Sequence, residues 1–379
     1  MKVSGDWLTR AETQDVLALL AAPGHRALPV GGCVRNALIG APVADVDIAT
    51  DALPETVIGL ARAAGLKAVP TGIAHGTVTV VAGGLPFEIT TFRRDVETFG
   101  RHAAIAFSTR IEEDAARRDF TMNALYACAD GTVIDPLGGL PDALARRLRF
   151  VGSAPDRIRE DYLRILRFFR FTAWYGDPAE GPDAEGLAAC AALADGIDGL
   201  SRERIGAEMK KLLSAPDPAP AIAAMAATGV LAHVLPGADA RALPVLVHLE
   251  GDLPPRWLRR LAVLGGEGTA AALRLSRAEA SDLEAIRTGI GDTQSAAALG
   301  WRQGIDRAVA VILARAALSG MPPPDDWQAE VLRGAAARFP VRAADLPDLS
   351  GPALGARLKE LEARWLAAGL RLTKAQLLA

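Results

Sequence analysis

Short runs of apolar and β-branched residues alternate with turn residues over the first 140 positions of the chain. These runs predict strands at residues 27–30, 44–49, 66–69, 76–82, 86–91 and 132–135. The pattern also predicts helices at residues 9–22, with Thr9 as N-cap, and at residues 55–64. The amino-terminal part is therefore expected to be a mixed α/β domain.

Beyond about residue 142 the strand pattern stops. Helical patterns follow, and clusters of Gly and Pro interrupt them at residues 175–182, 215–218 and 321–324. We therefore expect the α+β class, in which a mixed β-sheet with helices is followed by an all-α remainder. The predicted domains are residues 1–140, 141–215 and 216–379.

The overall charge of the chain is less informative about its partners than the positions of the charged residues. The 379 residues carry a net charge of −3, which by itself argues against a nucleic-acid partner. Eight arginines nevertheless fall between residues 146 and 170, against three acidic residues. A solvated helix face with ion pairs is the plain alternative to an RNA-binding surface.

No apolar run is long enough to span a membrane, and the amino-terminus carries no signal-peptide pattern, so we expect a cytoplasmic protein. The three cysteines, Cys33, Cys128 and Cys190, are far apart and are expected to be reduced.

Asp45 and Asp47 are the strongest chemical signal. On a strand, residues two apart point to the same face, so both carboxylates would meet at one edge and hold two Mg²⁺ ions for nucleotidyl transfer. Gly31 and Gly32 precede a helix start, where backbone amides and Arg35 would hold a triphosphate. Either feature alone is commonly a solvated strand edge or a tight turn.

Glu88 lies on the strand predicted at residues 86–91. If that strand neighbours the aspartate strand, Glu88 supplies a third catalytic carboxylate; a simple edge-strand charge is the equal alternative. The following segment, about residues 92–114, is too polar to pack and is expected to be a mobile loop over the site.

A segment near residue 120 carries further candidates. Arg117 or Arg118 would contact phosphate, and Asp119 would accept a hydrogen bond from a ribose hydroxyl. Asn123 lies four residues after Asp119 in the same segment and is grouped with the nucleotide-binding residues.

Asp161, Arg164 and Arg167 are spaced by three and would share one face of a helix. Asp161 would accept from an exocyclic amine while Arg164 donates to the neighbouring ring nitrogen, which fits cytosine and adenine. Guanine and uracil would leave groups unpaired, at about 1–3 kcal/mol each.

These motifs, in the order Gly-Gly-x-x-Arg, Asp-x-Asp, Arg-Arg-Asp-Phe-Thr-x-Asn-Ala, Asp-Pro and Glu-Asp-x-x-Arg-x-x-Arg, resemble those of the class II tRNA nucleotidyltransferases, the CCA-adding enzymes of the polymerase-β-like superfamily. The resemblance implies a catalytic head, a neck with a nucleotide-selecting helix, and a body and tail that bind the tRNA acceptor arm. It implies template-independent CCA addition from CTP and ATP, two Mg²⁺ ions on Asp45 and Asp47, and a base template of Asp161 and Arg164 supported by Arg167. In one departure, Asn36 stands where the family usually has Asp.

Three alternatives stay open: an enzyme that adds only A, a bacterial poly(A) polymerase with the same head, and a catalytically silent RNA-binding module. The full-length segment from Arg93 to Arg110 favours A addition, and residues 71–77 favour a CCA-adding enzyme over a poly(A) polymerase. The oligomeric state is not predicted.

Overall fold

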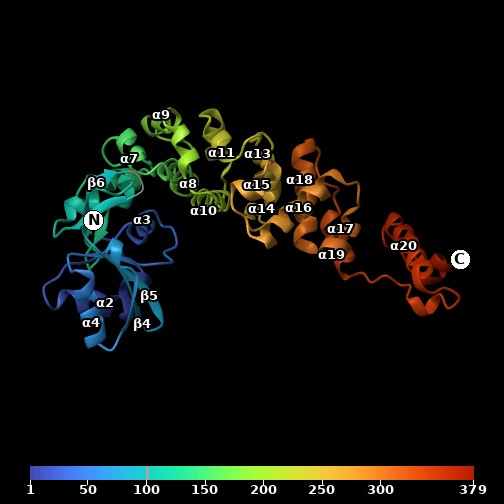
Figure 1. The fold of residues 1–379 in the computed structure, drawn as a ribbon, viewed down its shortest axis with the longest axis horizontal. Helices are drawn as coiled ribbons and strands as arrows, with labels where there is room; N and C mark the ends of the chain where they lie inside the picture. The colour runs from blue at the N-terminus through green and yellow to red at the C-terminus, as the bar shows by residue number, and fades with distance from the viewer. Residues whose placement is uncertain (100–101) are drawn as a thin grey trace. The chain divides into compact units, whose positions relative to one another are not determined.

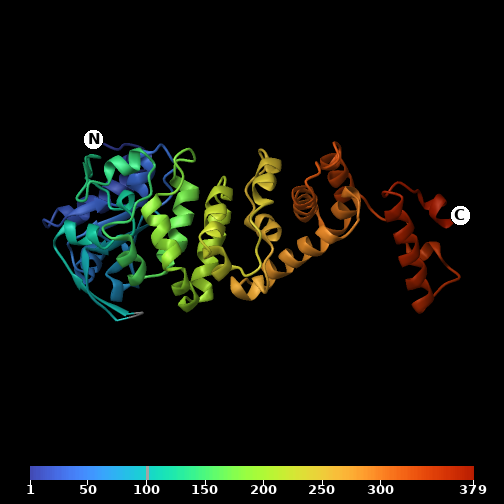
Figure 2. The same ribbon diagram turned by 90° about the horizontal axis from the view of Figure 1, so that it is seen from above.

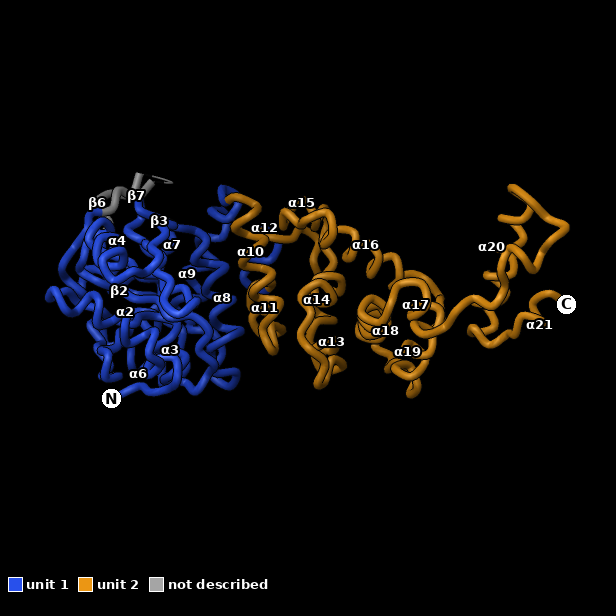
Figure 3. The backbone as a smooth tube through the Cα atoms, turned by 90° about the horizontal axis from the view of Figure 1, so that it is seen from below, with its two compact units in different colours: residues 1–200, 227–233 blue, residues 201–226, 234–379 orange. Residues whose placement is uncertain are grey.

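The computed structural model describes residues 1–99 and 102–379, with the backbone alone at residues 95–99 and 102–105. Its named strands all end by residue 134, and the described chain beyond them is helical, which confirms the predicted α+β class. The chain forms two compact units, residues 1–200 with 227–233 and residues 201–226 with 234–379 (Figure 3). The three predicted functional domains stay a prediction.

A five-stranded sheet organises the first unit. Its strands are β1 (Ala27–Pro29), β2 (Asp47–Thr50), β3 (Lys67–Gly72), β4 (Thr77–Ala82) and β5 (Leu85–Thr91), in the order β1-β2-β5-β4-β3. Figure 1 labels β4 and β5 beside helices α2 and α4. β2 and β5 run parallel, and the other neighbours run antiparallel. The parallel pair places Asp47 opposite Glu88.

Two helices, α2 (Ala11–Ala21) and α4 (Pro54–Ala63), pack on one face of this sheet. The strand residues under them are fully buried, among them Ile48, Val78, Val80 and Ile89. Alternation along β4 then sends Thr77 and Thr79 to the opposite face, which remains partly open. The sheet thus has one hydrophobic and one polar face.

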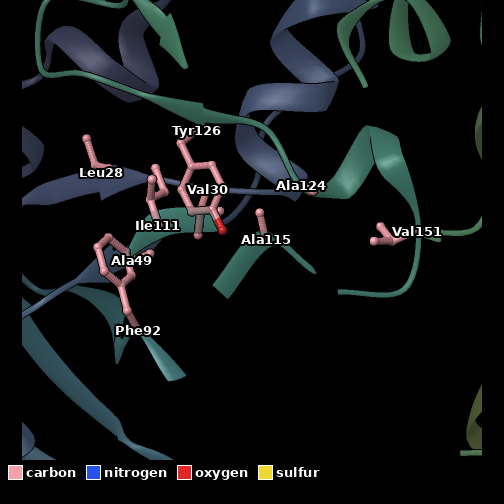
Figure 4. Close-up of a cluster of buried hydrophobic side chains, with 9 residues drawn as sticks. All are labelled: Leu28, Val30, Ala49, Phe92, Ile111, Ala115, Ala124, Tyr126 and Val151. Atoms are coloured by element: carbon pink, nitrogen blue, oxygen red, sulfur yellow. The ribbon is translucent and has the colours of Figure 1, made fainter. Parts of the chain in front are cut away.

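A second hydrophobic cluster covers the β1–β2 end of the open face (Figure 4). It joins Leu28 and Ala49 of the sheet to Phe92, to α5 (Ile111–Ala116) and to β8 (Tyr126–Ala127). The rings of Phe92 and Tyr126 meet edge to face, with centroids 6.4 Å apart. This cluster anchors the segment that carries the Arg-Arg-Asp motif.

The segment expected to be a loop instead contains a β-ribbon. β6 (Arg93–Phe99) pairs antiparallel with β7 (His102–Phe107), and residues 100–101 lie outside the described residues. The partner strand satisfies the backbone groups of a segment that has too little apolar surface to pack. The loop prediction missed this pairing.

Several element boundaries also differ from the predictions. The predicted helix at 9–22 is two helices, α1 (Asp6–Thr9) and α2, separated by Arg10. Thr9 is not an N-cap; its hydroxyl donates to the carbonyl of Gly5. The strand predicted at residues 132–135 is confirmed as β9 (Val133–Ile134), and it pairs with β8, which was not predicted.

The remaining helices of the first unit are α3 (Gly32–Leu38), η1 (Ile73–His75), η2 (Thr121–Asn123), α6 (Leu140–Leu144), α7 (Ala154–Glu160), α8 (Leu163–Tyr175), α9 (Ala184–Ala192) and η3 (Ala194–Gly199). Two helices straddle the division between the units, α11 (Ala219–Ala227) and α12 (Val230–Val234).

Helices make up the rest of the second unit (Figure 2). They are α10 (Arg202–Leu213), α13 (Leu243–Glu250), α14 (Trp257–Leu264), α15 (Thr269–Ala272), α16 (Arg277–Gly291), α17 (Ala296–Gln303), α18 (Ile305–Ser319), α19 (Trp327–Ala336), η4 (Ala343–Asp345), α20 (Gly351–Ala367) and α21 (Lys374–Leu378). Across the described residues, no helix has the length and apolarity needed to cross a membrane.

Candidate active site

Asp45 and Asp47 lie on the solvent side of the sheet, at the start of β2. β2 begins only at Asp47, so Asp45 precedes the strand and the expected strand start at residue 44 is wrong. Val46 between them is 2 % exposed, whereas both aspartates are exposed. This alternation places the two carboxylates on the same side, as period-two geometry requires.

Glu88 joins this pair from the neighbouring strand. The Cα register sets Asp47 directly opposite Glu88, so their side chains share one face of the sheet. Neighbouring protein groups displace part of the water around the Asp47 carboxylate, and this desolvation, together with the charges of Glu88 and Asp45, raises the pKa of Asp47 to about 6, while Arg118 opposes the rise. Three acidic groups thus crowd one surface, and a cation there would relieve their repulsion.

The donor set consists of carboxylate oxygens, which are the ligands that Mg²⁺ prefers. Over the residues the structure describes, no group of three His, Cys, Asp or Glu side chains converges tightly enough to form a complete metal site. The fit therefore rests on the chemistry and shared face of Asp45 and Asp47, with Glu88 beside them.

The glycine pair forms the turn between β1 and α3. Gly31 has φ +69°, a conformation that other residues rarely adopt, and its N–H donates to the carbonyl of Leu125 at 2.9 Å. A Cβ on Gly31 would lie 3.5 Å from Arg118 Nη1. The adjacent Val30 N–H donates to the carbonyl of Asp47, so the turn is tied to the carboxylate strand.

Arg35 does not occupy the exposed position expected of a triphosphate ligand. It is 4 % exposed, and Nη1 donates to Asn123 Oδ1. Its Nε and Nη2 donate to Asn36 Oδ1 at 3.2 and 2.9 Å, so Asn36 orients the arginine without a charge. Burial lowers the pKa of Arg35, whose guanidinium is engaged by Asn123 and Asn36.

Arg118, unlike Arg35, lies near enough to Asp47 for its charge to act on that carboxylate. Asp114, 1 % exposed, accepts from Arg118 Nη2 at 2.9 Å, from Arg117 Nε at 3.2 Å and from the Tyr126 hydroxyl at 2.7 Å. Burial opposes the charge on Asp114, but the two arginines and Tyr126 hold its pKa below the usual range. Asp114 was missed among the candidates, although its i, i+3 and i, i+4 spacing to the arginines was visible.

Asp119 is occupied by protein groups. Oδ1 accepts from the Phe120 N–H at 2.9 Å and from Asn123 Nδ2 at 3.0 Å, and Oδ2 accepts from Arg167 Nε at 2.8 Å. Burial would raise the pKa of Asp119, but Arg167 and the hydrogen bonds hold it below the usual range. A ribose hydroxyl would compete with these partners, so the expected ribose contact finds no support in this geometry.

Asp161 does not share a helix with Arg164 and Arg167. α7 ends at Glu160, Asp161 is extended with φ −155°, and α8 begins at Leu163. The Asp161 carboxylate accepts from the N–H of Leu163, the first residue of α8, at 3.1 Å. The prediction of one continuous helix is wrong, because this side-chain-to-backbone bond competes with the helical ladder.

Arg164 is also engaged within the protein. Its guanidinium donates to the carbonyls of Arg157 at 2.8 Å and Arg117 at 3.2 Å, and it forms an ion pair with Glu160 at 2.5 Å. Arg164 therefore lies beside the Arg-Arg-Asp segment, and its role in base selection stays a prediction.

Comparison with known proteins identifies the family. The family model described as "Poly A polymerase head domain" matches residues 27–149, and "Probable RNA and SrmB- binding site of polymerase A" matches residues 182–241. A CCA-adding enzyme of Geobacillus stearothermophilus is 37 % identical over 346 residues, covering 87 % of this chain and 83 % of the relative. The mitochondrial CCA tRNA nucleotidyltransferase 1 of Mus musculus is 43 % identical over 197 residues, covering 52 % and 45 %.

Solved structures give the same result. The crystal structure of the Bacillus stearothermophilus CCA-adding enzyme in complex with CTP matches with a TM-score of 0.75 and 32 % identity, covering 94 % of this chain and 92 % of that one. The Thermotoga maritima CCA-adding enzyme complexed with tRNA shares the fold at a TM-score of 0.70 and 19 % identity, covering 100 % and 97 %. The chain belongs to the family of class II CCA-adding enzymes and poly(A) polymerases, with a polymerase-β-like head.

Proposed function

We propose that this chain adds C, C and A without a template to the 3′ end of tRNA, using CTP and ATP and releasing pyrophosphate. The observation that carries the proposal is the shared face of Asp45, Asp47 and Glu88, beside the Gly31 turn, in a chain 37 % identical to a CCA-adding enzyme over 87 % of its length.

Asp45 and Asp47 would hold Mg²⁺, and Glu88 would complete the acidic surface. When bound, the metal supplies charge neutralisation for the triphosphate and activation of the attacking hydroxyl. Binding of a cation would relieve the repulsion among these carboxylates, the same repulsion by which Glu88 and Asp45 raise the pKa of Asp47.

Arg118 is the arginine we assign to the triphosphate. Asp114 and Tyr126 hold its guanidinium near Gly31, and the field of Arg118 acts on Asp47. Arg117 lies beside it on Asp114. Arg35, Asn123 and Asp119 then serve as positioning residues beneath the nucleotide site rather than as ligands.

Selection of C and A is assigned to Asp161 and Arg164. They flank the break between α7 and α8, and Arg164 donates to the carbonyl of Arg117, next to the assigned triphosphate arginine. Arg167 supports them through its ion pair with Asp119. A cytoplasmic location stays a prediction.

The test is an extension assay with purified protein and Mg²⁺. Labelled CTP, ATP, GTP and UTP are offered singly and in pairs to tRNAs that lack CCA, CA or A, and products are resolved at single-nucleotide length. Addition of C, C and A followed by a stop is the expected result. Addition of A alone, a long A ladder, or no product would each contradict the proposal, in favour of an A-adding enzyme, a poly(A) polymerase or a silent RNA-binding module respectively.

A further inference from the structure

Two threonine hydroxyls extend the carboxylate face toward the far edge of the sheet. Thr79 on β4 has Glu88 as its Cα partner, so the row that begins at Asp47 continues through Glu88 to Thr79. Val78 and Val80, on either side of Thr79, are fully buried, which confirms that Thr79 points to the opposite, open face. The Thr79 hydroxyl lies 2.8 Å from the hydroxyl of Thr71 on β3.

An irregularity in the strand pairing brings Thr71 to this position. The register of β3 against β4 shifts between Val69 and Gly72, and Thr71 lies in the shifted segment. Such irregularities re-aim side chains and are frequent beside active sites. Thr71 is exposed and Thr79 is half-buried, so the pair is accessible from solvent.

The strand order assigns the two substrates to opposite sides of the carboxylates. The order β1-β2-β5-β4-β3 places the Gly31–Gly32 turn, which follows β1, on one side of Asp47. β4 and β3 lie on the other side, and Thr79 is two strand spacings from Asp47, about 10 Å. If the nucleotide is held at the turn, the acceptor must approach over β4 and β3.

The hydroxyl pair fits the backbone of that acceptor. One hydrogen is shared between Thr71 and Thr79, which leaves one O–H donor and several lone pairs for a ligand. A phosphate oxygen can accept a hydrogen bond from the free O–H group, and a ribose 2′-hydroxyl can donate one to the lone pairs of the threonine oxygens. Lys67 is exposed at the end of β3, on the same face, since its Cα partner is Val81.

We propose that Thr71 and Thr79 form a subsite for the sugar-phosphate backbone at the 3′ end of the acceptor RNA. The inference rests on the proposed function, because it requires an RNA acceptor at the carboxylates. A cationic side chain at this place would form an ion pair with Glu88 and so neutralise part of the acidic site. The hydroxyls are neutral, so they can bind the RNA backbone and leave the charge of Glu88 unpaired by them.

The test compares T71V/T79V with wild type, since valine keeps the branched shape and removes only the hydroxyl. We expect KM for tRNA lacking the terminal A to rise about tenfold at saturating ATP, while KM for ATP at saturating tRNA stays unchanged. T79S keeps a hydroxyl at this position, so its KM for tRNA should lie much closer to that of wild type than the KM of T79V does. The control is T77V/T90V, a hydroxyl pair 3.1 Å apart on the same face but beside Ala49 instead of Asp47.

Binding without turnover gives a second readout. Fluorescence anisotropy with labelled tRNA lacking the terminal A, in the absence of nucleotide, should show weaker binding for T71V/T79V than for T77V/T90V. An unchanged KM for tRNA, or equal rises in both KM values, would overturn the proposal. If wild type binds this RNA but extends none, the proposed function fails, while the anisotropy comparison still decides whether the subsite exists.

Discussion

The guanidinium of Arg35 lies over the ring of Tyr175, with its central carbon 3.7 Å from the ring centroid. This contact joins α3, directly after the Gly31 turn, to the last residue of α8. A second connection runs from Arg35 through Asn123 and Asp119 to Arg167, near the start of α8. The glycine turn and the helix assigned to base selection are therefore held together at two points.

Replacing Tyr175 with Leu should lower the free energy of unfolding by about 1–2 kcal/mol, because a buried cation such as Arg35 over the face of a half-buried ring is worth roughly that amount. Denaturant unfolding at neutral pH measures the change. Tyr175→Phe keeps the ring and should stay close to wild type. Equal stability of the Leu and Phe variants would show that the ring contributes nothing through its face.

Asp119→Asn should cost about 1–3 kcal/mol of stability at neutral pH, since it removes a charged partner from Arg167. The pKa of Asp119 is held below its usual value, so its stabilising effect is present above about pH 4 and is lost as the pH falls through the lowered pKa. The difference between wild type and Asp119→Asn should therefore shrink as unfolding is measured below pH 4. A difference that grows on acidification would contradict this assignment.

Asp47→Asn should reduce nucleotide addition by about 10³-fold or more while the protein stays folded, because a metal ligand contributes several kcal/mol to the transition state. Asp15→Asn, at an exposed position on α2, is the matched control and should be neutral. The readouts are initial rate and thermal midpoint. Residual activity within tenfold of wild type would exclude Asp47 as an essential ligand.

Arg164→Ala should relax base choice by about tenfold, as GTP and UTP no longer meet a guanidinium in the wrong position. The measurement is kcat/KM for each of the four nucleotides. Arg159→Ala removes a nearby exposed arginine that pairs with Asp156 and serves as the control. An Arg164→Ala enzyme that still accepts only C and A would refute the template role.

Glu250→Gln should destabilise the second unit by about 3–5 kcal/mol. Glu250 is 3 % exposed and forms ion pairs with Arg259 and Arg260, each 2.7 Å away and at most 3 % exposed, so the variant leaves uncompensated buried charge. Glu267→Gln, at an exposed position, is the control for unfolding measurements. A loss below 1 kcal/mol would mean that the glutamate charge is dispensable.

The periodic features were predictable from local patterns. Alternation placed Asp45 and Asp47 on one side, and the loss of strand signals near residue 142 marked the change to helices. Residues two apart on an extended chain share a face in any fold, so these conclusions needed no tertiary information. The motifs from Gly31 to Arg167 likewise identified the family that the relatives confirm.

Only the tertiary structure decided which partner each side chain has. Arg35 is 88 residues from Asn123, and Asp119 is 48 residues from Arg167, so no local pattern reveals that these groups bind one another. Strand order is also decided only in the folded chain: it places Glu88 beside Asp47 and Thr79 beside Glu88. The sequence by itself determined the fold class, the acidic pair and the family. The folded chain decided which polar residues are consumed in holding the site and which remain open to substrate, because burial and pairing arise between segments that meet only on folding.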